Sequence, residues 1–309
     1  MAFNRLNDLY FKQLLGDERR KDLTLCFLND ILERDGNGPY TDILFKDKDI
    51  EPDGLDGKLS KLDICAKLND GSLVDIEVQV AARRMMFERV LYYWSNLYGS
   101  ELSSGSVYTN IGKTISIILT NFDCLHGEEN WHTPCYIMSA NSGRKLTDYF
   151  AIHFLELPKF QFKDIMKLRR AEWWMAYFSN RCTEKELETM AVKDKTIQKV
   201  LEYETYFKDN PEERRKYELR EKAIRDYNSD MQENRELGRE EGHAKGLEEG
   251  HAKGLEEGRA EGEHKKAKAV VFNMLRLGMD MEQIMAVADV TRKEAEALRQ
   301  EWEKENDRA

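Results

Sequence analysis

Two carboxylates lie in a stretch of sequence that predicts a β-hairpin. In residues 61–80, KLDICAKLNDGSLVDIEVQV, apolar and polar residues alternate on both sides of an Asn-Asp-Gly turn. Alternation with a period of two predicts two half-buried strands. Asp63 lies in the first strand and Glu77 in the second. Carboxylate oxygens are ligands that Mg²⁺ prefers, and a bound Mg²⁺ activates water for phosphodiester hydrolysis.

The length of the turn decides whether these carboxylates meet. A two-residue turn at Asp70-Gly71 would place Asp63 opposite Val78, and the acids would then point to opposite faces. A three-residue loop that starts one residue earlier, with Gly71 in a left-handed conformation, would place Asp63 opposite Glu77. The first register buries unpaired charges at a cost of several kcal/mol each. We therefore predict the second register.

In the predicted register, the polar side chains of both strands share one face. Asp63 and Glu77 are neighbours with Cβ atoms roughly 5 Å apart, and Lys61 lies opposite Gln79. Such a face is also typical of a solvated surface with cross-strand ion pairs. The hairpin by itself leaves both interpretations open.

A helix is predicted directly after the hairpin, over about residues 81–102. Met86, Val90 and Leu97 are among its apolar residues at three- and four-residue spacing. We expect this helix to pack on the apolar face of the hairpin, which includes Leu62 and Ile76. The acidic face would then be free for substrate.

Several segments carry a resemblance to a known family. They are DLYFK at 8–12, LDI at 62–64, IEVQ at 76–79, FERVLYYW at 87–94 and FLELPKF at 154–160. In this order they resemble the PD-(D/E)XK nucleases, in the branch of Rpn-type recombination-promoting nucleases and transposases. In that branch Glu-x-Gln replaces Glu-x-Lys. The resemblance covers roughly the first 170 to 230 residues.

This resemblance implies a fold and a set of roles. The implied fold is α/β, a restriction-endonuclease-like core with a mixed sheet flanked by helices. Asp63 and Glu77 match the two metal-binding acids, and the backbone carbonyl of Val78 completes that kind of site. Gln79 matches a lysine that orients or activates water, but glutamine carries no charge and is no base at neutral pH. The implied cofactor is Mg²⁺, and Mn²⁺ suits the same oxygen ligands.

Nearby basic residues can supply the missing positive charge or bind DNA phosphates. Lys61 faces the acids in the predicted register and is a candidate catalytic residue, with an ordinary ion pair or a solvated side chain as the alternative. The resemblance implies that the opening helix runs close to the active edge, where Lys12 could approach phosphate. Arg83 and Arg84 directly follow the second strand and are candidate DNA contacts, with ordinary solvated charges as the alternative.

Composition limits the class of protein. The 309 residues are 41% hydrophobic and 34% charged, which suits one α/β core with a charged extension. The sequence contains no run of about 18 apolar residues and no apolar signal segment at its start, so we expect no membrane association. Five scattered cysteines fit a reducing compartment, the cytoplasm. The net charge of −10 opposes long-range attraction to DNA, so basic groups must act locally.

The sequence changes character beyond about residue 230. EEGHAKGL at 240–247 repeats at 248–255, and glycine recurs every fourth residue from Gly238 to Gly262. Each glycine costs a lone helix about 1 kcal/mol, whereas small residues at this spacing favour close helix–helix approach. We predict a helix that can support a homo-oligomer, with a flexible charged linker as the alternative. The remaining residues predict a small helical segment that breaks at Gly278.

The predicted organisation is a nuclease-like domain at 1–230, a glycine-repeat helix or linker at 231–264 and a C-terminal helical segment at 265–309. The predicted function is Mg²⁺-dependent DNA endonuclease activity, in which phosphodiester bonds are hydrolysed. The link to recombination or mobile DNA comes from the family resemblance. The alternative is a catalytically inactive relative that keeps the fold as a DNA-binding or assembly module.

Overall fold

A computed structural model of the chain describes residues 3–33, 36, 38–46, 49–50, 60–61, 63–82, 84–101 and 111–306, with the backbone alone at 49, 50, 60, 61 and 228. The chain forms two compact units, residues 1–224 and 225–309. Among the described helices, none combines the length and the apolar character needed to cross a bilayer.

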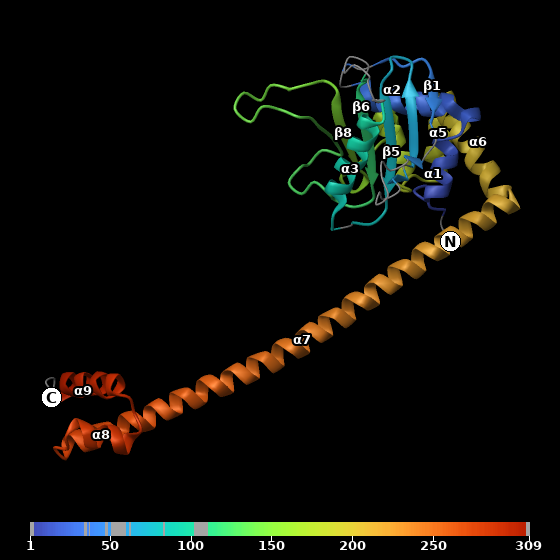
Figure 1. The fold of residues 1–309 in the computed structure, drawn as a ribbon. Coiled ribbons are helices and arrows are strands. Elements are labelled where there is room, and N and C mark those ends of the chain that lie inside the picture. Colours follow the sequence, from blue (N-terminus) through green and yellow to red (C-terminus); the bar gives the residue numbers. More distant parts are fainter. Residues whose placement is uncertain are drawn as a thin grey trace. The chain divides into compact units, whose positions relative to one another are not determined.

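A mixed six-stranded sheet lies at the centre of the first unit, with the strand order β1-β4-β5-β6-β8-β7 (Figure 1). β5, β6 and β8 run parallel, whereas β1, β4 and β7 pair antiparallel with their neighbours. β2 and β3 form a separate two-stranded ribbon. The strands are β1 (Ile43–Phe45), β2 (Asp49–Ile50), β3 (Ser60–Lys61), β4 (Ile64–Leu68), β5 (Leu73–Gln79), β6 (Thr114–Thr120), β7 (His132–Cys135) and β8 (Phe150–Glu156). The predicted α/β fold with a mixed sheet is confirmed.

One face of this sheet is covered by helices from both ends of the unit (Figure 1). These helices and short 3-10 segments are α1 (Asp8–Leu15), η1 (Glu18–Arg20), α2 (Lys21–Leu32), η4 (Leu157–Lys159), η5 (Ile165–Lys167), α4 (Arg170–Phe178), α5 (Glu184–Lys193) and α6 (Lys195–Asp209). Phe11, Phe27 and Trp174 pack with Val74 and Ile76 of β5 in the main core. The side chain of Asn7 begins α1 by accepting hydrogen bonds from two backbone N–H groups in its first turn.

The opposite face carries α3 (Met86–Gly99), which corrects one prediction. Met86 and Val90 pack on Phe154 and its neighbours, and Leu97 packs on Cys65. α3 therefore covers the same face of the sheet as Glu77, and the prediction that it packs on the apolar face of the hairpin is wrong. Central parallel strands are apolar on both faces, so the face that is acidic in the hairpin continues as an apolar surface in β6 and β8.

The glycine repeat lies within one long helix, α7 (Pro211–Arg276), which is 66 residues long. The predicted helix is confirmed, and a Cβ atom added at any repeat glycine from Gly238 to Gly262 would meet nothing described within 4 Å. α8 (Met281–Ala288) and α9 (Arg292–Asn306) follow the predicted break at Gly278, whose φ is +74°. Val271, Ile284 and Leu298 are part of the small core of this second unit.

Candidate active site

The β4–β5 hairpin has the predicted register. Ile64 pairs with Ile76 and Lys67 with Leu73, so the extended ladder brings position 63 opposite position 77. The loop has three residues, because the Leu68 N–H donates to the Ser72 carbonyl at 2.8 Å. Gly71 has a φ of +89°, which glycine adopts at little cost. The turn chemistry therefore fixes the face on which each carboxylate lies.

Asp63 stands just before β4, where the backbone ladder ends. Its Oδ2 accepts a hydrogen bond from the Val78 N–H at 3.1 Å. This N–H points from β5 toward β4, so the Asp63 side chain satisfies a backbone donor beyond the end of the described ladder. Its Oδ1 lies 2.8 Å from the Lys12 ammonium of α1. Both side chains are largely covered, with 18% of Asp63 and 21% of Lys12 exposed. Each oxygen of this carboxylate therefore has a partner.

Glu77 is far more buried, with 4% of the residue exposed. Its Oε2 accepts a hydrogen bond from the Gln79 side-chain amide at 3.1 Å. Burial and repulsion by Asp63 raise the pKa of Glu77 to about 7, although the positive charge of Arg89 opposes the shift. The carboxyl group is thus poised to exchange a proton or a cation near neutral pH.

A third acid, Asp75, lies on the same face as Glu77 and was not among the predicted site residues. It is 1% exposed, with Cys65 opposite on β4 and Ser116 beside it on β6. Within the described part of the chain, its Oδ1 has no hydrogen-bond partner. Burial, with the nearby charges of Glu77 and Asp63, raises the pKa of Asp75 well above its usual value. Its place in the alternation indicated the face on which it lies, but no sequence pattern indicated its burial.

Two cations approach the carboxylates from different helices. Lys12 reaches Asp63 from α1, and the charge of Arg89 on α3 acts on Glu77. The Arg89 guanidinium also donates to the Tyr93 hydroxyl at 3.2 Å. Sequence reasoning named Lys12 as a phosphate contact but did not name Arg89, because only the packing of α3 on the acidic face brings Arg89 there.

The other predicted basic residues lie in three different settings. The backbone of Lys61 belongs to β3 and pairs with Asp49, and the described β4–β5 pairing, which ends at Ile64 and Ile76, does not extend to Lys61. Its side chain lies outside the described atoms, and Arg83, like Leu62 of the predicted apolar face, lies outside the described residues. Arg84 is exposed in the turn before α3.

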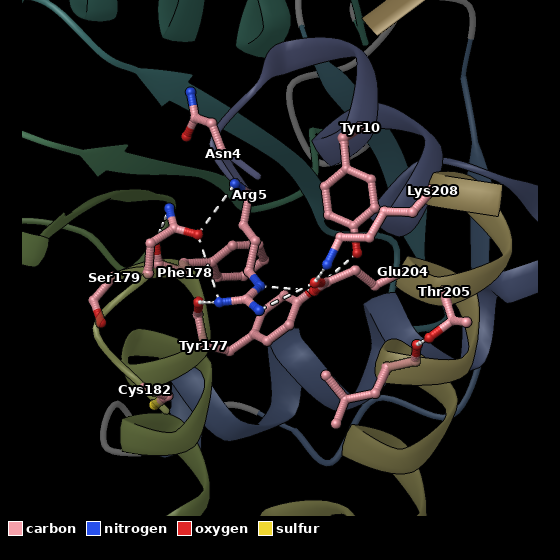
Figure 2. A network of polar contacts seen from close by, with 12 residues as sticks. Asn4, Arg5, Tyr10, Tyr177, Phe178, Ser179, Cys182, Glu204, Thr205 and Lys208 are labelled. Atoms are coloured by element: carbon pink, nitrogen blue, oxygen red, sulfur yellow. Dashed lines mark hydrogen bonds and ion pairs between the residues drawn. The ribbon is translucent and has the colours of Figure 1, made fainter. Parts of the chain in front are cut away.

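A buried network of polar side chains fixes the position of α1 (Figure 2). The Arg5 guanidinium holds Glu204 of α6 through contacts of 2.7 and 3.1 Å. The Tyr177 hydroxyl donates to the same carboxylate at 2.7 Å and also pairs with the hydroxyl of Tyr10 in α1. Lys208 is ion-paired with Glu204 as well. The helix that carries Lys12 is thus tied to α4 and α6.

The first turns of α7 also contact α1. The Arg220 guanidinium donates hydrogen bonds to the Asp8 carboxylate from two nitrogens, with the Nε atom 2.8 Å from Oδ1. The Asn7 amide donates to Glu221 at 2.7 Å, and the Gln13 amide to Glu213 at 2.8 Å. The start of α7 therefore belongs with the sheet unit and stabilises the helix that carries Lys12.

The donor set at the hairpin fits a hard divalent cation. Among the described residues, no three or more His, Cys, Asp and Glu side chains gather as a metal cluster. Mg²⁺ does not need such a cluster, because it accepts one or two protein carboxylates and keeps several waters. The Val78 N–H faces Asp63, and the carbonyl of a strand residue projects to the same side as its N–H. Two carboxylates and one backbone oxygen can therefore converge there.

Comparison with known proteins gives one match. A family model described as PD-(D/E)XK nuclease family transposase matches residues 5–234. The matched segment begins at Arg5, contains the hairpin and ends inside α7. No curated protein and no solved structure matches the chain significantly.

Proposed function

The chain belongs to the PD-(D/E)XK nuclease family of transposases, and from this premise we propose that it is a divalent-metal-dependent DNA endonuclease acting on mobile or recombining DNA. The observation that carries the proposal is the cross-strand position of Asp63 and Glu77, with the Val78 backbone beside them. Two adjacent carboxylates with little exposure to water are costly to maintain unless positive charge balances both, and Lys12 is ion-paired with Asp63 alone of the two.

In this proposal, Asp63, Glu77 and the Val78 carbonyl hold Mg²⁺ or Mn²⁺. When bound, such an ion generates a nucleophilic water and stabilises negative charge on the phosphate. Gln79 orients Glu77 through its hydrogen bond of 3.1 Å and, being neutral, can place a water but not deprotonate it. With a pKa of about 7, Glu77 must release its proton before it can serve as a metal ligand near neutral pH.

Substrate contacts are proposed from the basic residues around the hairpin. Arg83, Arg84 and Lys12 are proposed to contact DNA phosphates, and Lys61 remains a candidate for charge stabilisation near the scissile bond. Contacts of this kind position the strand without reading its sequence. The overall net charge of −10 makes binding depend on such local groups and on salt concentration.

The setting and assembly of the protein are also proposals. A DNA substrate and five cysteines that are all free of disulfides fit the reducing cytoplasm. The exposed glycine repeat of α7 is proposed to pair with the same helix of a second copy, because glycine permits close backbone approach. Light scattering of the full chain and of a variant with Ala at Gly246, Gly250 and Gly254 tests this. An unchanged dimer mass, or a monomeric parent protein, would reject pairing through the repeat.

The decisive experiment for the enzyme is cleavage of supercoiled plasmid with Mg²⁺ or Mn²⁺. We expect nicking by the parent protein that EDTA abolishes and that Asp63→Ala and Glu77→Gln each reduce at least a hundredfold. Asp42→Asn is the matched control, because this acid is exposed and its side chain pairs with Lys21 at the turn end of the hairpin, away from Asp63 and Glu77. Cutting that survives both site substitutions would reject the proposed site.

A catalytically inactive DNA-binding or assembly module is the second candidate. The observation in its favour is that Glu77 is 4% exposed beneath α3, which limits access to this carboxylate. Absence of cutting across linear, supercoiled and branched DNA, together with retained DNA binding, would favour this second function.

A further inference from the structure

The Asp63 carboxylate is already paired with a positively charged side chain, that of Lys12. The Lys12 ammonium lies 2.8 Å from Oδ1, and the Val78 N–H donates to Oδ2 at 3.1 Å. An ion pair this well covered interacts more strongly than an exposed one, because solvent screens it less. A divalent ion that binds Asp63 must therefore compete with Lys12 for the same carboxylate.

The backbone of Lys12 is held in place while its head group can turn. α1 is fixed by Arg220 at Asp8 and by the hydroxyl pair of Tyr10 and Tyr177. At its end, a Cβ atom added at Gly16 would lie 3.2 Å from Ile64 Cγ1, so the glycine lets the helix approach β4 closely. Lysine has a flexible stem of four carbons, which lets the ammonium move by a few ångströms without moving the helix.

The neighbouring arginines are less suited to such an exchange. The Arg220 guanidinium is engaged by two nitrogens on Asp8, and Arg89 is hydrogen-bonded to Tyr93, whose ring it also contacts. Both side chains are thereby held in their present positions. Lys12 contacts a candidate ligand directly and presents a compact charge with three N–H donors, a form that suits single phosphate oxygens.

We propose that Lys12 is an exchangeable counter-ion of the active site, which pairs with Asp63 in the metal-free protein and moves to a non-bridging oxygen of the DNA phosphate when a divalent ion takes Asp63. The inference rests on the proposed nuclease function. In this role the ammonium transfers no proton and forms no covalent bond. It supplies a positive charge that the neutral Gln79 does not provide.

The proposal predicts effects of opposite sign when Lys12 is replaced by a neutral residue of similar length. In Lys12→Met, we expect Mn²⁺ to bind the DNA-free protein roughly tenfold more tightly, because its competitor is gone. We expect the cleavage rate to fall roughly a hundredfold, because a charge at the phosphate is lost. Lys12→Arg should keep the parent metal affinity and part of the activity. Calorimetric titration with Mn²⁺ and plasmid nicking measure the two effects.

Controls separate this inference from the nuclease proposal. Lys21→Met removes a lysine from an exposed ion pair with Asp42, and it should change neither quantity. Weaker or unchanged Mn²⁺ binding in Lys12→Met, in a protein whose binding is lost in Asp63→Ala, would overturn the counter-ion role and leave the metal site standing. A parent protein that binds no Mn²⁺ and cuts no DNA would overturn both.

A measurement on the unsubstituted protein keeps the test independent of variant folding. Reductive methylation with ¹³C-formaldehyde labels the lysine side chains, and each resulting signal reports its own surroundings. Titration with Mg²⁺ should shift the Lys12 signal saturably, as the ammonium leaves Asp63, while the Lys21 signal stays in place. A Lys12 signal that does not move at metal saturation would overturn the exchange.

Discussion

Two glutamates of the sheet unit are equally shielded from solvent, yet their pKa values shift in opposite directions. Glu204 and Glu77 are each 4% exposed. Burial alone raises the pKa of both carboxyl groups, but hydrogen bonds and charges from Arg5 and Lys208 bring the pKa of Glu204 below its usual value. Glu77 has a neutral amide as its hydrogen-bond donor and Asp63 as its neighbour, and its pKa rises to about 7. Burial alone therefore does not decide the ionisation of a carboxyl group, because the charges and donors around it can reverse the shift.

The difference separates a carboxylate that the fold itself balances from one that we propose a metal ion balances. The Glu204 network is complete and ties α1, α4 and α6 together (Figure 2). At Glu77 the negative charge is not fully balanced. The neighbouring Asp75 has one oxygen without a hydrogen-bond partner among the described residues. Buried acids with raised pKa values are typical of functional sites, including those that bind a cation.

The largest effect is expected from breaking the hydrogen-bond network around Glu204. Arg5→Ala should lower the free energy of unfolding by about 3–5 kcal/mol, because it leaves Glu204 buried without its main partner. Urea denaturation measures the change. A double variant with Glu204→Gln should recover part of the loss. A loss below about 1 kcal/mol would mean that Glu204 finds another partner or reaches water.

The next effect is expected when a divalent ion binds at Asp63 and Glu77. At pH 8, Mg²⁺ at a hundred times its dissociation constant should stabilise the parent protein by about 2.7 kcal/mol. Glu77→Gln and Asp63→Ala should lose this gain, while Asp42→Asn should keep it. Thermal unfolding with Mg²⁺ or with EDTA measures it, and equal stabilisation of all four proteins would place the ion elsewhere.

An effect of similar size follows from the pKa of Glu77 itself. Its pKa rises from 4.5 to about 7 on folding, so the folded state binds more protons between these values. Stability from this group is therefore complete below about pH 4.5 and is lost as the pH rises through about 7. Glu77→Gln does not titrate and should be more stable than the metal-free parent by about 3 kcal/mol above pH 7. Denaturation at pH 4 and pH 8 tests this, and an advantage that is independent of pH would contradict it.

The smallest effect is expected at Asp75. Burial and the nearby charges of Glu77 and Asp63 raise the pKa of Asp75 well above its usual value, which favours the neutral carboxyl group, and Asp75→Asn replaces it by another neutral group. The free energy of unfolding at pH 6 should change by less than about 1 kcal/mol. A loss of several kcal/mol would show that Asp75 is charged and paired, as Glu204 is.

The hairpin illustrates what sequence alone could predict. The period of two, the cost of buried charge and the need for a left-handed Gly71 were enough to choose the correct register. The α/β fold followed from the family resemblance. The roles assigned to Asp63, Glu77, Val78 and Gln79 remain predictions, although the structure brings these residues together.

The surroundings of the hairpin could not be predicted in the same way. The face on which α3 packs depends on Ile118 and Phe154, which pair into the sheet far along the chain. The partner of Asp63 comes from α1, and no local pattern connects Lys12 to a strand some fifty residues later. The backbone of Lys61 pairs with Asp49 of β2, a partner that the alternation in the hairpin did not indicate.

The hydrogen bond from the Val78 N–H to Asp63 gives the protein an intrinsic reporter. A backbone amide bound to a carboxylate has a characteristic proton resonance and exchanges slowly with solvent. Any event that reorients or neutralises Asp63, whether protonation, cation exchange or substitution, must change that single resonance. The occupancy of the site can thus be followed in solution by one amide in the strand, in the absence of DNA and of any turnover.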